Sequence, residues 1–273
     1  MKKKQSFFLF TINTNLYVSL CVLSLTFSSE ILLETQNHNI SLFVFFATVF
    51  TYNFQRIIRI KKGTKHKRKE WTLNNLPLVY FLIVMGVIGS FYHFFQFRTN
   101  TQILIFISGI ISVLYPLVLR KVPYCKIFII AFTWTISTII LLISENNIPL
   151  ESNIYLHIIS RFLFVFAITI PFDIRDIKYD NIKLKTIPII TGISQSKTIA
   201  IIALFVLSLI SIYQFHNYNL SIEYLIAIIL SCLFSSILIG KSDEKKSDFF
   251  FSFWIESCSI LFYLFLLLSI LIS

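Results

Sequence analysis

Residues 170–188, IPFDIRDIKYDNIKLKTIP, place three aspartates and four basic residues directly after a long apolar segment. The apolar segment has the length of a membrane-spanning helix. If that helix continues past Pro171, then Asp173, Asp176 and Asp180 share one face, because residues three and four apart are neighbours on a helix. The stretch therefore predicts a group of carboxylates where a helix leaves the membrane.

The composition of the whole chain is typical of a membrane protein. Of its 273 residues, 56% are hydrophobic, and the mean hydropathy is +0.79, which is unusual for a soluble domain. Apolar blocks of helix length recur along the chain, whereas a spanning barrel would show alternating polarity. Since no long polar stretch is left over, we predict one domain over residues 1–273, an all-α polytopic bundle of nine transmembrane helices.

Charge predicts how this bundle sits in the membrane. The nine segments cover residues 6–27, 40–58, 77–95, 102–119, 125–143, 154–171, 198–214, 223–240 and 251–272. All of the 24 lysines and arginines except Arg98 and Arg161 fall on one side of this arrangement. The positive-inside rule then places the N-terminus in the cytoplasm and the C-terminus outside the cytoplasmic (inner) membrane. The net charge of +11 is accordingly assigned to loops that face anionic membrane lipids, and not to nucleic-acid binding.

The aspartates after the sixth segment have two interpretations. Asp176 and Asp180, four residues apart, suit a hard divalent cation such as Mg²⁺, which keeps positions for water and phosphate oxygens. Lys178 and Lys185 would add positive charge beside the phosphate group that such a cation binds. Alternatively, the stretch is a solvated loop whose opposite charges pair with one another.

Two motifs resemble a known family. The sequence DIRDIKYDNIKLKT resembles the second aspartate-rich motif of the UbiA superfamily of intramembrane prenyltransferases, and most of all its menaquinone-type branch. The matching positions are Asp173, Arg175, Asp176, Asp180, Lys185 and Thr186. YPLVLRKVPYCK, which begins at Tyr115, is similar to the family's Tyr-Pro-x-x-Lys-Arg segment near the substrate, and Arg120 is retained. The family has nine transmembrane helices with acidic motifs after the second and sixth, which agrees with the position of the quoted stretch.

The resemblance implies a reaction and roles for particular residues. A polyprenyl diphosphate would ionise at its allylic C–O bond, Mg²⁺ would hold the leaving diphosphate, and an aromatic or other lipophilic acceptor would capture the prenyl group. Asp173, Asp176 and Asp180 would be catalytic, with Asp176 and Asp180 as metal ligands. The implied substrate-binding residues are Asn53, Arg56, Arg59, Tyr115, Arg120, Lys178 and Lys185.

The first acidic motif departs from the family pattern. An asparagine should be followed by aspartates four and eight residues later, but Asn53 is followed by Ile57 and Lys61 at those positions. Arg56 and Arg59 stand nearby, three residues apart. We hypothesise that their guanidinium groups bind the diphosphate directly and replace a metal-bridged contact. The alternative is that both belong to the basic loop that faces lipid.

Smaller departures occur in the other two motifs. Leu119 stands where the Tyr-Pro segment has lysine, and Leu184 stands where the quinone-type motif has glycine. Separately, Arg161 and Glu256 lie inside predicted helices and are expected to face the bundle interior, because ionisable groups are costly in lipid.

Two functions remain open from the sequence, and a third has little support. The leading one is a divergent UbiA-type prenyltransferase. The alternative is a non-catalytic protein of the same fold that binds an isoprenoid or an anionic lipid, which the missing aspartates favour. A transporter is poorly supported, because the sequence shows neither an internal repeat nor a pair of Gly/Pro-broken helices.

Overall fold

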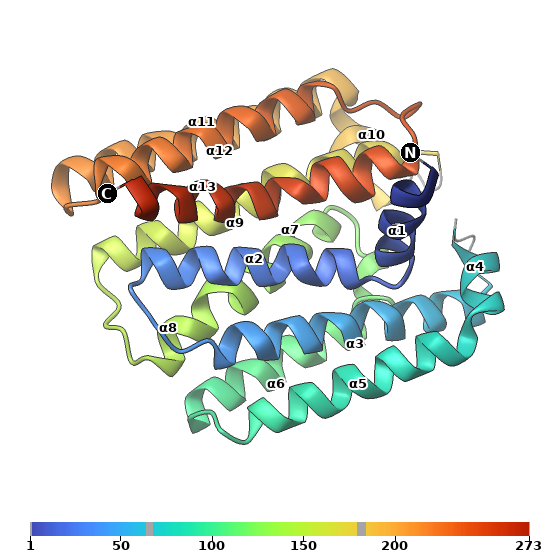
Figure 1. Cartoon of the computed structure of the whole chain (residues 1–273). Helices are drawn as coiled ribbons and strands as arrows, with labels where there is room; N and C mark the ends of the chain where they lie inside the picture. The colour runs from blue at the N-terminus through green and yellow to red at the C-terminus, as the bar shows by residue number, and fades with distance from the viewer. Residues whose placement is uncertain (1, 64–67, 179–183, 273) are drawn as a thin grey trace.

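The computed structural model describes residues 2–63, 68–178 and 184–272, and every regular element in these ranges is a helix. The long helices run side by side, whereas the short helices α1, α4 and α10 gather at one end of the bundle (Figure 1). The α-helices are α1 (Lys2–Asn13), α2 (Leu16–Leu32), α3 (Asn39–Lys61), α4 (Lys69–Asn74), α5 (Leu76–Phe94), α6 (Thr99–Leu114), α7 (Cys125–Thr135), α8 (Leu141–Glu145), α9 (Ser152–Asp176), α10 (Ile187–Thr191), α11 (Ile193–Asn217), α12 (Ile222–Gly240) and α13 (Glu256–Ile272).

Two π-helical segments and one 3₁₀ turn complete the described elements. Residues Ile136–Ile140 join α7 to α8, and residues Phe250–Ile255 lead into α13. A 3₁₀ turn, Leu119–Lys121, follows α6. The wider π turns rotate the side chains that follow them, and such turns are frequent at functional sites.

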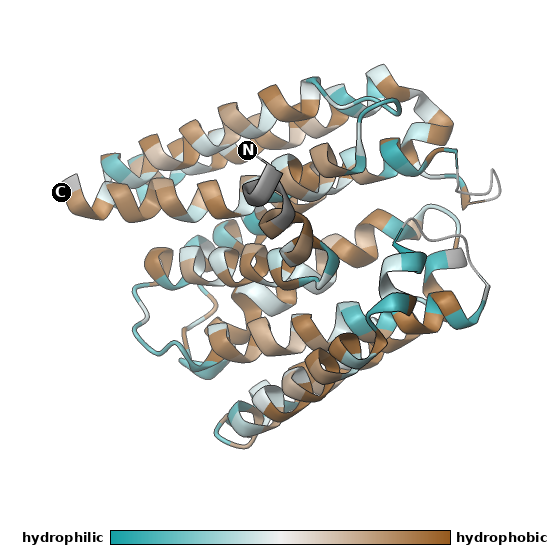
Figure 2. Cartoon of the chain, turned by 45° about the vertical axis from the view of Figure 1, so that its right-hand side comes forward, coloured by the Kyte–Doolittle hydropathy of each residue, from teal (hydrophilic) through white to brown (hydrophobic). Residues whose placement is uncertain are grey.

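Seven helices are long and apolar enough to cross a membrane: α3, α5, Cys125–Glu145, α9, α11, α12 and Phe250–Leu271. The pair Phe7–Asn13 and Leu16–Leu32 counts as an eighth span if it is taken together, and α6 is a shorter apolar helix. Every predicted segment thus corresponds to an apolar helix or bent pair, which confirms the polytopic helical fold. Hydropathy changes along the bundle, with apolar residues along the helices and polar residues gathered at their ends (Figure 2).

The first predicted segment, residues 6–27, is not one straight helix. Asn15 adopts a left-handed conformation, with φ of 60°, between α1 and α2. Asparagine tolerates this conformation better than most residues. The two helical pieces are bent by 79° from each other, so α1 turns across the end of the bundle.

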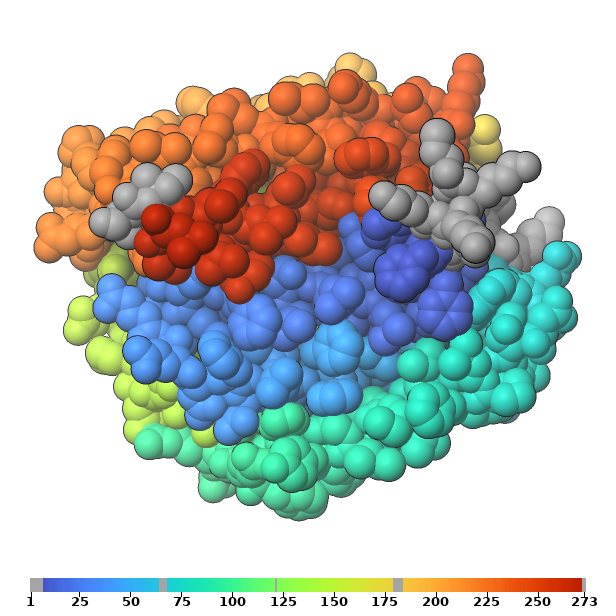
Figure 3. Space-filling model, viewed as in Figure 1, coloured from blue at the N-terminus to red at the C-terminus, as the bar shows by residue number. Residues whose placement is uncertain are grey.

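α9 packs mainly against α11 and α7, and much of its surface is buried. Phe164, Ala167, Ile168, Ile170 and Ile174 of α9 belong to the main apolar core, together with residues of α2, α7, α11, α12 and α13. On the face seen in Figure 3, α2 lies between α13 and α3. Many large apolar side chains on the outer helix faces are exposed, as expected where helices contact lipid instead of water.

Candidate functional site

A cavity of about 780 Å³ opens toward the end of the bundle that carries α1 and α4. Its walls come from α1, α2, α3, α4, α6, α7, α9 and α13 and from the segments that follow α3, α6 and α12. Among the described residues, seven basic side chains line it: Arg56, Arg59, Arg68, Lys69, Arg120, Lys126 and Arg175. Five acidic side chains line it as well: Glu70, Asp173, Asp176, Asp248 and Glu256. The balance is positive, so the cavity favours an anionic ligand.

The last turn of α9 supplies the carboxylates expected from the sequence. α9 continues through Pro171 to Asp176, so Asp173 and Asp176 face the cavity together, as their spacing predicts. Lys126 of α7 contacts both carboxylates, with its Nζ 2.8 Å from Asp173 Oδ1 and 3.9 Å from Asp176 Oδ2. Asp180, the third aspartate of the motif, lies outside the described residues.

Arg175 links Asp176 to the opposite wall. Its Nε lies 2.8 Å from Asp176 Oδ1, and its Nη2 donates to Oδ2 at 3.3 Å. Its Nη1 lies 3.2 Å from Asp248 Oδ1. Arg68 then contacts Asp248 Oδ2 at 3.0 Å and donates to Ser252 Oγ at 2.6 Å. Alternating charges thus connect α7, α9, the segment that leads into the π-helical turn Phe250–Ile255 and the segment before α4, which satisfies ionic groups withdrawn from water.

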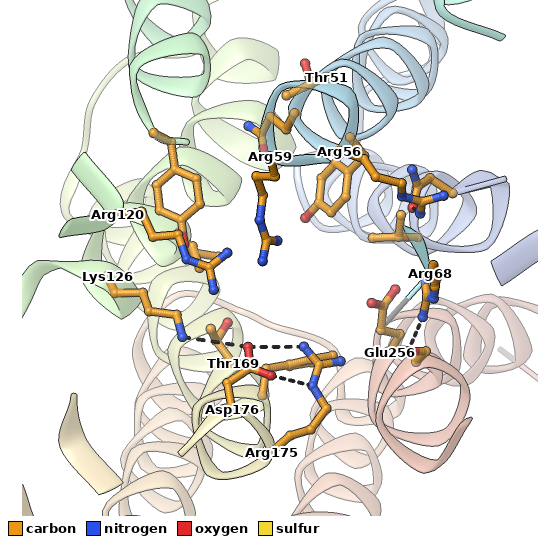
Figure 4. Close-up of a pocket in the computed structure, with 18 of the residues that line it drawn as sticks. Thr51, Arg56, Arg59, Arg68, Arg120, Lys126, Thr169, Arg175, Asp176 and Glu256 are labelled. Atoms are coloured by element: carbon orange, nitrogen blue, oxygen red, sulfur yellow. Dashed lines mark hydrogen bonds and ion pairs between the residues drawn. The ribbon is translucent and has the colours of Figure 1, made fainter. Parts of the chain in front are cut away.

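The two arginines of α3 have different surroundings. Arg56 is 4% exposed and donates hydrogen bonds to the Asn13 backbone oxygen and to Asn15 Oδ1. Arg59 extends toward the open centre of the cavity, facing Arg120 from the other wall (Figure 4). Rotation of about 300° over three residues of a helix directs the first arginine to the break between α1 and α2, and the second into the cavity.

Asn53, like Arg56, has its side chain bonded to the turn between α1 and α2. It is fully buried, its Nδ2 donates to Thr14 O at 3.0 Å and to Val49 O at 2.9 Å, and its Oδ1 accepts from Asn15 Nδ2 at 3.0 Å. Asn53 is not among the residues that line the cavity. Its contacts hold the left-handed turn at Asn15 against α3, and the substrate contact implied by the resemblance stays a prediction.

Of the other predicted binding residues, two line the cavity and two do not. Tyr115 and Arg120, which follow α6, line the cavity, and the Arg120 amide donates to Tyr115 O at 2.9 Å. Lys178 is exposed and lies 3.8 Å from Glu244. Lys185 has its Nζ 5.4 Å from the Tyr124 ring centroid. Neither lysine is among the described lining residues.

Several lining residues were not predicted as site residues. Lys126, Arg68 and Asp248 complete the charged network, although from sequence they read only as loop or loop-adjacent charges. Glu256, predicted only to face the interior, lines the cavity where α13 begins. It directly follows the π-helical segment Phe250–Ile255, and such segments are frequent at functional sites.

The cavity becomes less polar away from the charged mouth. Ile111, Ile129, Ile130, Trp134 and Ile168 line it together with Thr133 and Thr169. Two polar atoms on α13, Glu256 Oε2 and Ser259 Oγ, are buried and lack a hydrogen-bond partner among the described residues. This arrangement suits an amphipathic ligand with an anionic head at the mouth and an apolar body within the membrane.

The carboxylates on α9 are oxygen ligands of the kind that Mg²⁺ prefers. Among the described residues, however, no three His, Cys, Asp or Glu side chains are grouped closely enough to hold a metal ion. The facing wall on α3 presents Arg59, where the family motif would present aspartates. The described donors on the α9 side are thus two carboxylates, Asp173 and Asp176, and α3 offers no carboxylate for a second ion.

Comparisons with known proteins agree with this architecture. A profile of the UbiA prenyltransferase family matches residues 73–258. A UbiA homologue from Aeropyrum pernix K1, solved in its apo form, superposes with a TM-score of 0.69 at 13% identity, covering 93% of this chain and 98% of that one. A homologue from Archaeoglobus fulgidus bound to GPP and Mg²⁺ has a TM-score of 0.67 at 14% identity, covering 95% and 98%. No curated protein sequence matches the chain.

The matched region includes the α9 motif and the segment after α6, and it begins after α3, whose acidic motif is altered. The match covers well over half of the chain, and the fold agrees along nearly its whole length. This chain is therefore a member of the UbiA prenyltransferase family.

Proposed function

We propose that this protein transfers a prenyl group from a polyprenyl diphosphate to a lipophilic acceptor within the membrane. The observation that carries the proposal is the cavity, with a net positive mouth and an apolar interior reached from the same end of the bundle. A prenyl diphosphate has the complementary structure, a compact anion joined to a long apolar chain. The A. fulgidus homologue with 14% identity is described with bound GPP and Mg²⁺, which supports this class of donor.

The residues around the mouth would hold the diphosphate from three sides. Arg59 approaches from α3, Arg120 from the turn after α6 and Lys126 from α7 (Figure 4). Their charges would stabilise the negative charge that develops on the leaving group as the allylic C–O bond breaks, with the electron pair passing to the diphosphate oxygen. Guanidinium groups suit phosphate oxygens because their N–H groups form paired hydrogen bonds.

Asp176, with Asp173 beside it, would hold a single Mg²⁺, and Asp180 stays a predicted ligand outside the described residues. The ion would supply further charge stabilisation at the diphosphate. Lys126 and Arg175 neutralise these aspartates in the structure described here, so the two cations would shift toward the diphosphate when the carboxylates take a metal.

The inner part of the cavity would shield the prenyl carbocation from water and receive the acceptor. Trp134 and the surrounding isoleucines supply apolar walls, and an aromatic face also stabilises a nearby cation. Glu256 and Ser259 offer polar atoms for the acceptor's own polar group. The acceptor attacks the allylic carbon and releases its proton after the new bond forms.

The test is binding of a non-ionising geranyl diphosphate analogue to the purified protein, with geraniol as the matched control that lacks the diphosphate. We expect saturable binding of the analogue and much weaker binding of geraniol. Incubation with labelled geranylgeranyl diphosphate and a membrane lipid extract should then give a prenylated product by mass spectrometry. Equal binding of analogue and geraniol would contradict the proposal.

A second candidate is a non-catalytic member of the family that binds an isoprenoid or an anionic lipid. The absence of carboxylates from the facing surface of α3 favours it, because loss of one of two metals should cost about a thousandfold in rate unless cations compensate. This candidate predicts analogue binding without any prenylated product. The basic mouth is expected to lie at the cytoplasmic surface, among anionic lipids.

A further inference from the structure

A second, much smaller cavity surrounds Arg161, far along α9 from the aspartates. Its volume is about 20 Å³, enough for one particle of the size of a water molecule. α9 provides His157, Ser160 and Arg161, whereas α11 provides Ser211 and Gln214. The other lining residues are Leu32, Ile139, Phe164, Leu207, Ile228 and Phe262.

Arg161 is only partly satisfied by its protein neighbours. Its side chain is 4% exposed, and its Nη2 donates to Ser28 Oγ at 2.6 Å and Ser29 Oγ at 2.9 Å. The guanidinium carbon lies 5.3 Å from the centroid of the Phe262 ring. Its Nη1 is buried without an acceptor among the described residues. All of these contacts are to neutral groups, so none of them provides a counterion for the guanidinium.

The charge balance around this cavity differs from that of the larger one. Every described side chain that lines it is neutral or basic, and no carboxylate is among them. Glu30 follows the two serines on α2, but its carboxylate bonds to His38 and Ser41 instead. A guanidinium withdrawn into the bundle without a counterion is costly, which is why such groups in membrane proteins are usually paired.

Further hydrogen-bond donors surround the cavity. Ser160 Oγ is buried without a partner among the described residues, like Arg161 Nη1. His157, one helical turn before Arg161, is 6% exposed and lines the same cavity. A guanidinium N–H, a hydroxyl and an imidazole can all donate toward one acceptor. This is an arrangement for an anion, because a neutral water would leave the charge unpaired.

We propose that this cavity binds one small monovalent anion of the halide class, such as chloride, as the counterion of Arg161. The volume admits a single small particle and excludes phosphate or a carboxylate-bearing lipid. The anion would tie α9 to α2, α11 and α13, whose residues meet there. It would therefore stabilise the folded bundle without taking part in chemistry at the larger cavity.

The test compares the thermal unfolding of the purified, detergent-solubilised protein in chloride, bromide and gluconate at equal ionic strength. We expect a Tm several degrees higher in chloride or bromide than in gluconate, which is too large to enter, because a ligand that binds only the folded state stabilises it. Arg161→Gln should remove this dependence. Arg98→Gln, at an exposed arginine, is the matched control and should keep it.

The larger basic cavity is the competing source of a chloride effect, and Arg59→Gln separates the two. A chloride effect that survives in Arg161→Gln and disappears in Arg59→Gln would overturn the proposal. Should Arg161→Gln fail to fold, anomalous scattering from bromide-soaked crystals of the parent protein decides the question. A bromide peak beside Arg161 supports the site, and the absence of a peak there would contradict the proposal.

Discussion

Arg59 and Arg56 lie three residues apart on α3 but have different surroundings. Both side chains line the cavity, but Arg59 faces Arg120, whereas Arg56 is bonded to the turn between α1 and α2. The sequence placed both near the diphosphate without distinguishing them. We propose that Arg59 binds the diphosphate and that Arg56 supports the turn, and substitutions at the two positions can separate these roles.

Arg59→Gln should weaken the binding of the non-ionising geranyl diphosphate analogue without lowering the Tm of the protein. Loss of hydrogen bonds to a charged group costs about 2 kcal/mol, or about thirtyfold in affinity. Isothermal titration of the purified variant measures the change. Lys62→Gln, at an exposed lysine just beyond α3, is the control and should bind like the parent. Unchanged affinity in Arg59→Gln would remove Arg59 from the site.

Arg56→Gln should have the opposite profile. The Asn13 carbonyl and Asn15 Oδ1 would each lose a buried donor, and leaving such groups unsatisfied costs about 1–3 kcal/mol. We expect a lower Tm in thermal unfolding, with analogue affinity close to that of the parent in the fraction that stays folded. An unchanged Tm combined with lost binding would show that Arg56, too, contacts the diphosphate.

Asp176→Asn should remove the effect of Mg²⁺ on analogue binding. The parent is expected to bind more tightly in Mg²⁺ than in EDTA, because a metal held by Asp176 adds charge beside the diphosphate. The variant lacks one ligand charge and should bind equally in both conditions. Asp243→Asn changes an acidic residue outside the cavity lining and should keep the Mg²⁺ effect. A parent affinity that is insensitive to Mg²⁺ would argue against any metal at this site.

At the scale of elements, two glycines of α5 lie in close contact with α3. A Cβ added at Gly86 would lie 2.7 Å from Phe50 N and 2.9 Å from Phe46 O on α3, and one at Gly89 would collide with the Phe46 ring. Small residues allow helix backbones to approach in membranes, where packing is the main attraction between helices. This contact fixes α3, and with it Arg59, against the outer helices.

Gly86→Ala should therefore destabilise the bundle by about 1–3 kcal/mol, because the obstructing atoms are backbone and cannot rotate away. Gly109→Ala is the matched control on α6, where a Cβ meets nothing within 4 Å. Thermal unfolding of both variants in the same detergent measures the difference. Equal Tm values for the two alanine variants would mean that α3 and α5 can move apart to admit the Cβ without loss of stability.

At the scale of the whole molecule, the ends of the chain lie at opposite ends of the bundle (Figure 1). The charged cavity mouth lies at the end that carries α1 and α4. The distribution of lysine and arginine predicts that this end faces the cytoplasm. Soluble reporter domains fused after residues 65 and 148 should therefore report opposite sides of the membrane, the first cytoplasmic. Reporters on the same side would contradict the topology.

The sequence by itself determined the class of the molecule and its α9 motif. Apolar segment length and loop charge are local quantities, so they predicted the helical spans, and the spacing of Asp173 and Asp176 predicted that both share one helix face. The nine segments were approximate only where α1 bends away from α2 and where α6 is short.

The tertiary structure alone decided which charges meet. Lys126, Arg68 and Asp248 are distant in sequence from Asp176, and they join it because four segments converge at one end of the bundle. The left-handed turn at Asn15 takes up the side-chain contacts of Asn53 and Arg56, so that Asn53 does not line the cavity and Arg56 lines it while bonded to the turn. The direction of a side chain depends on how each helix is rotated and packed, and that is set by contacts between segments that no local pattern in the chain encodes.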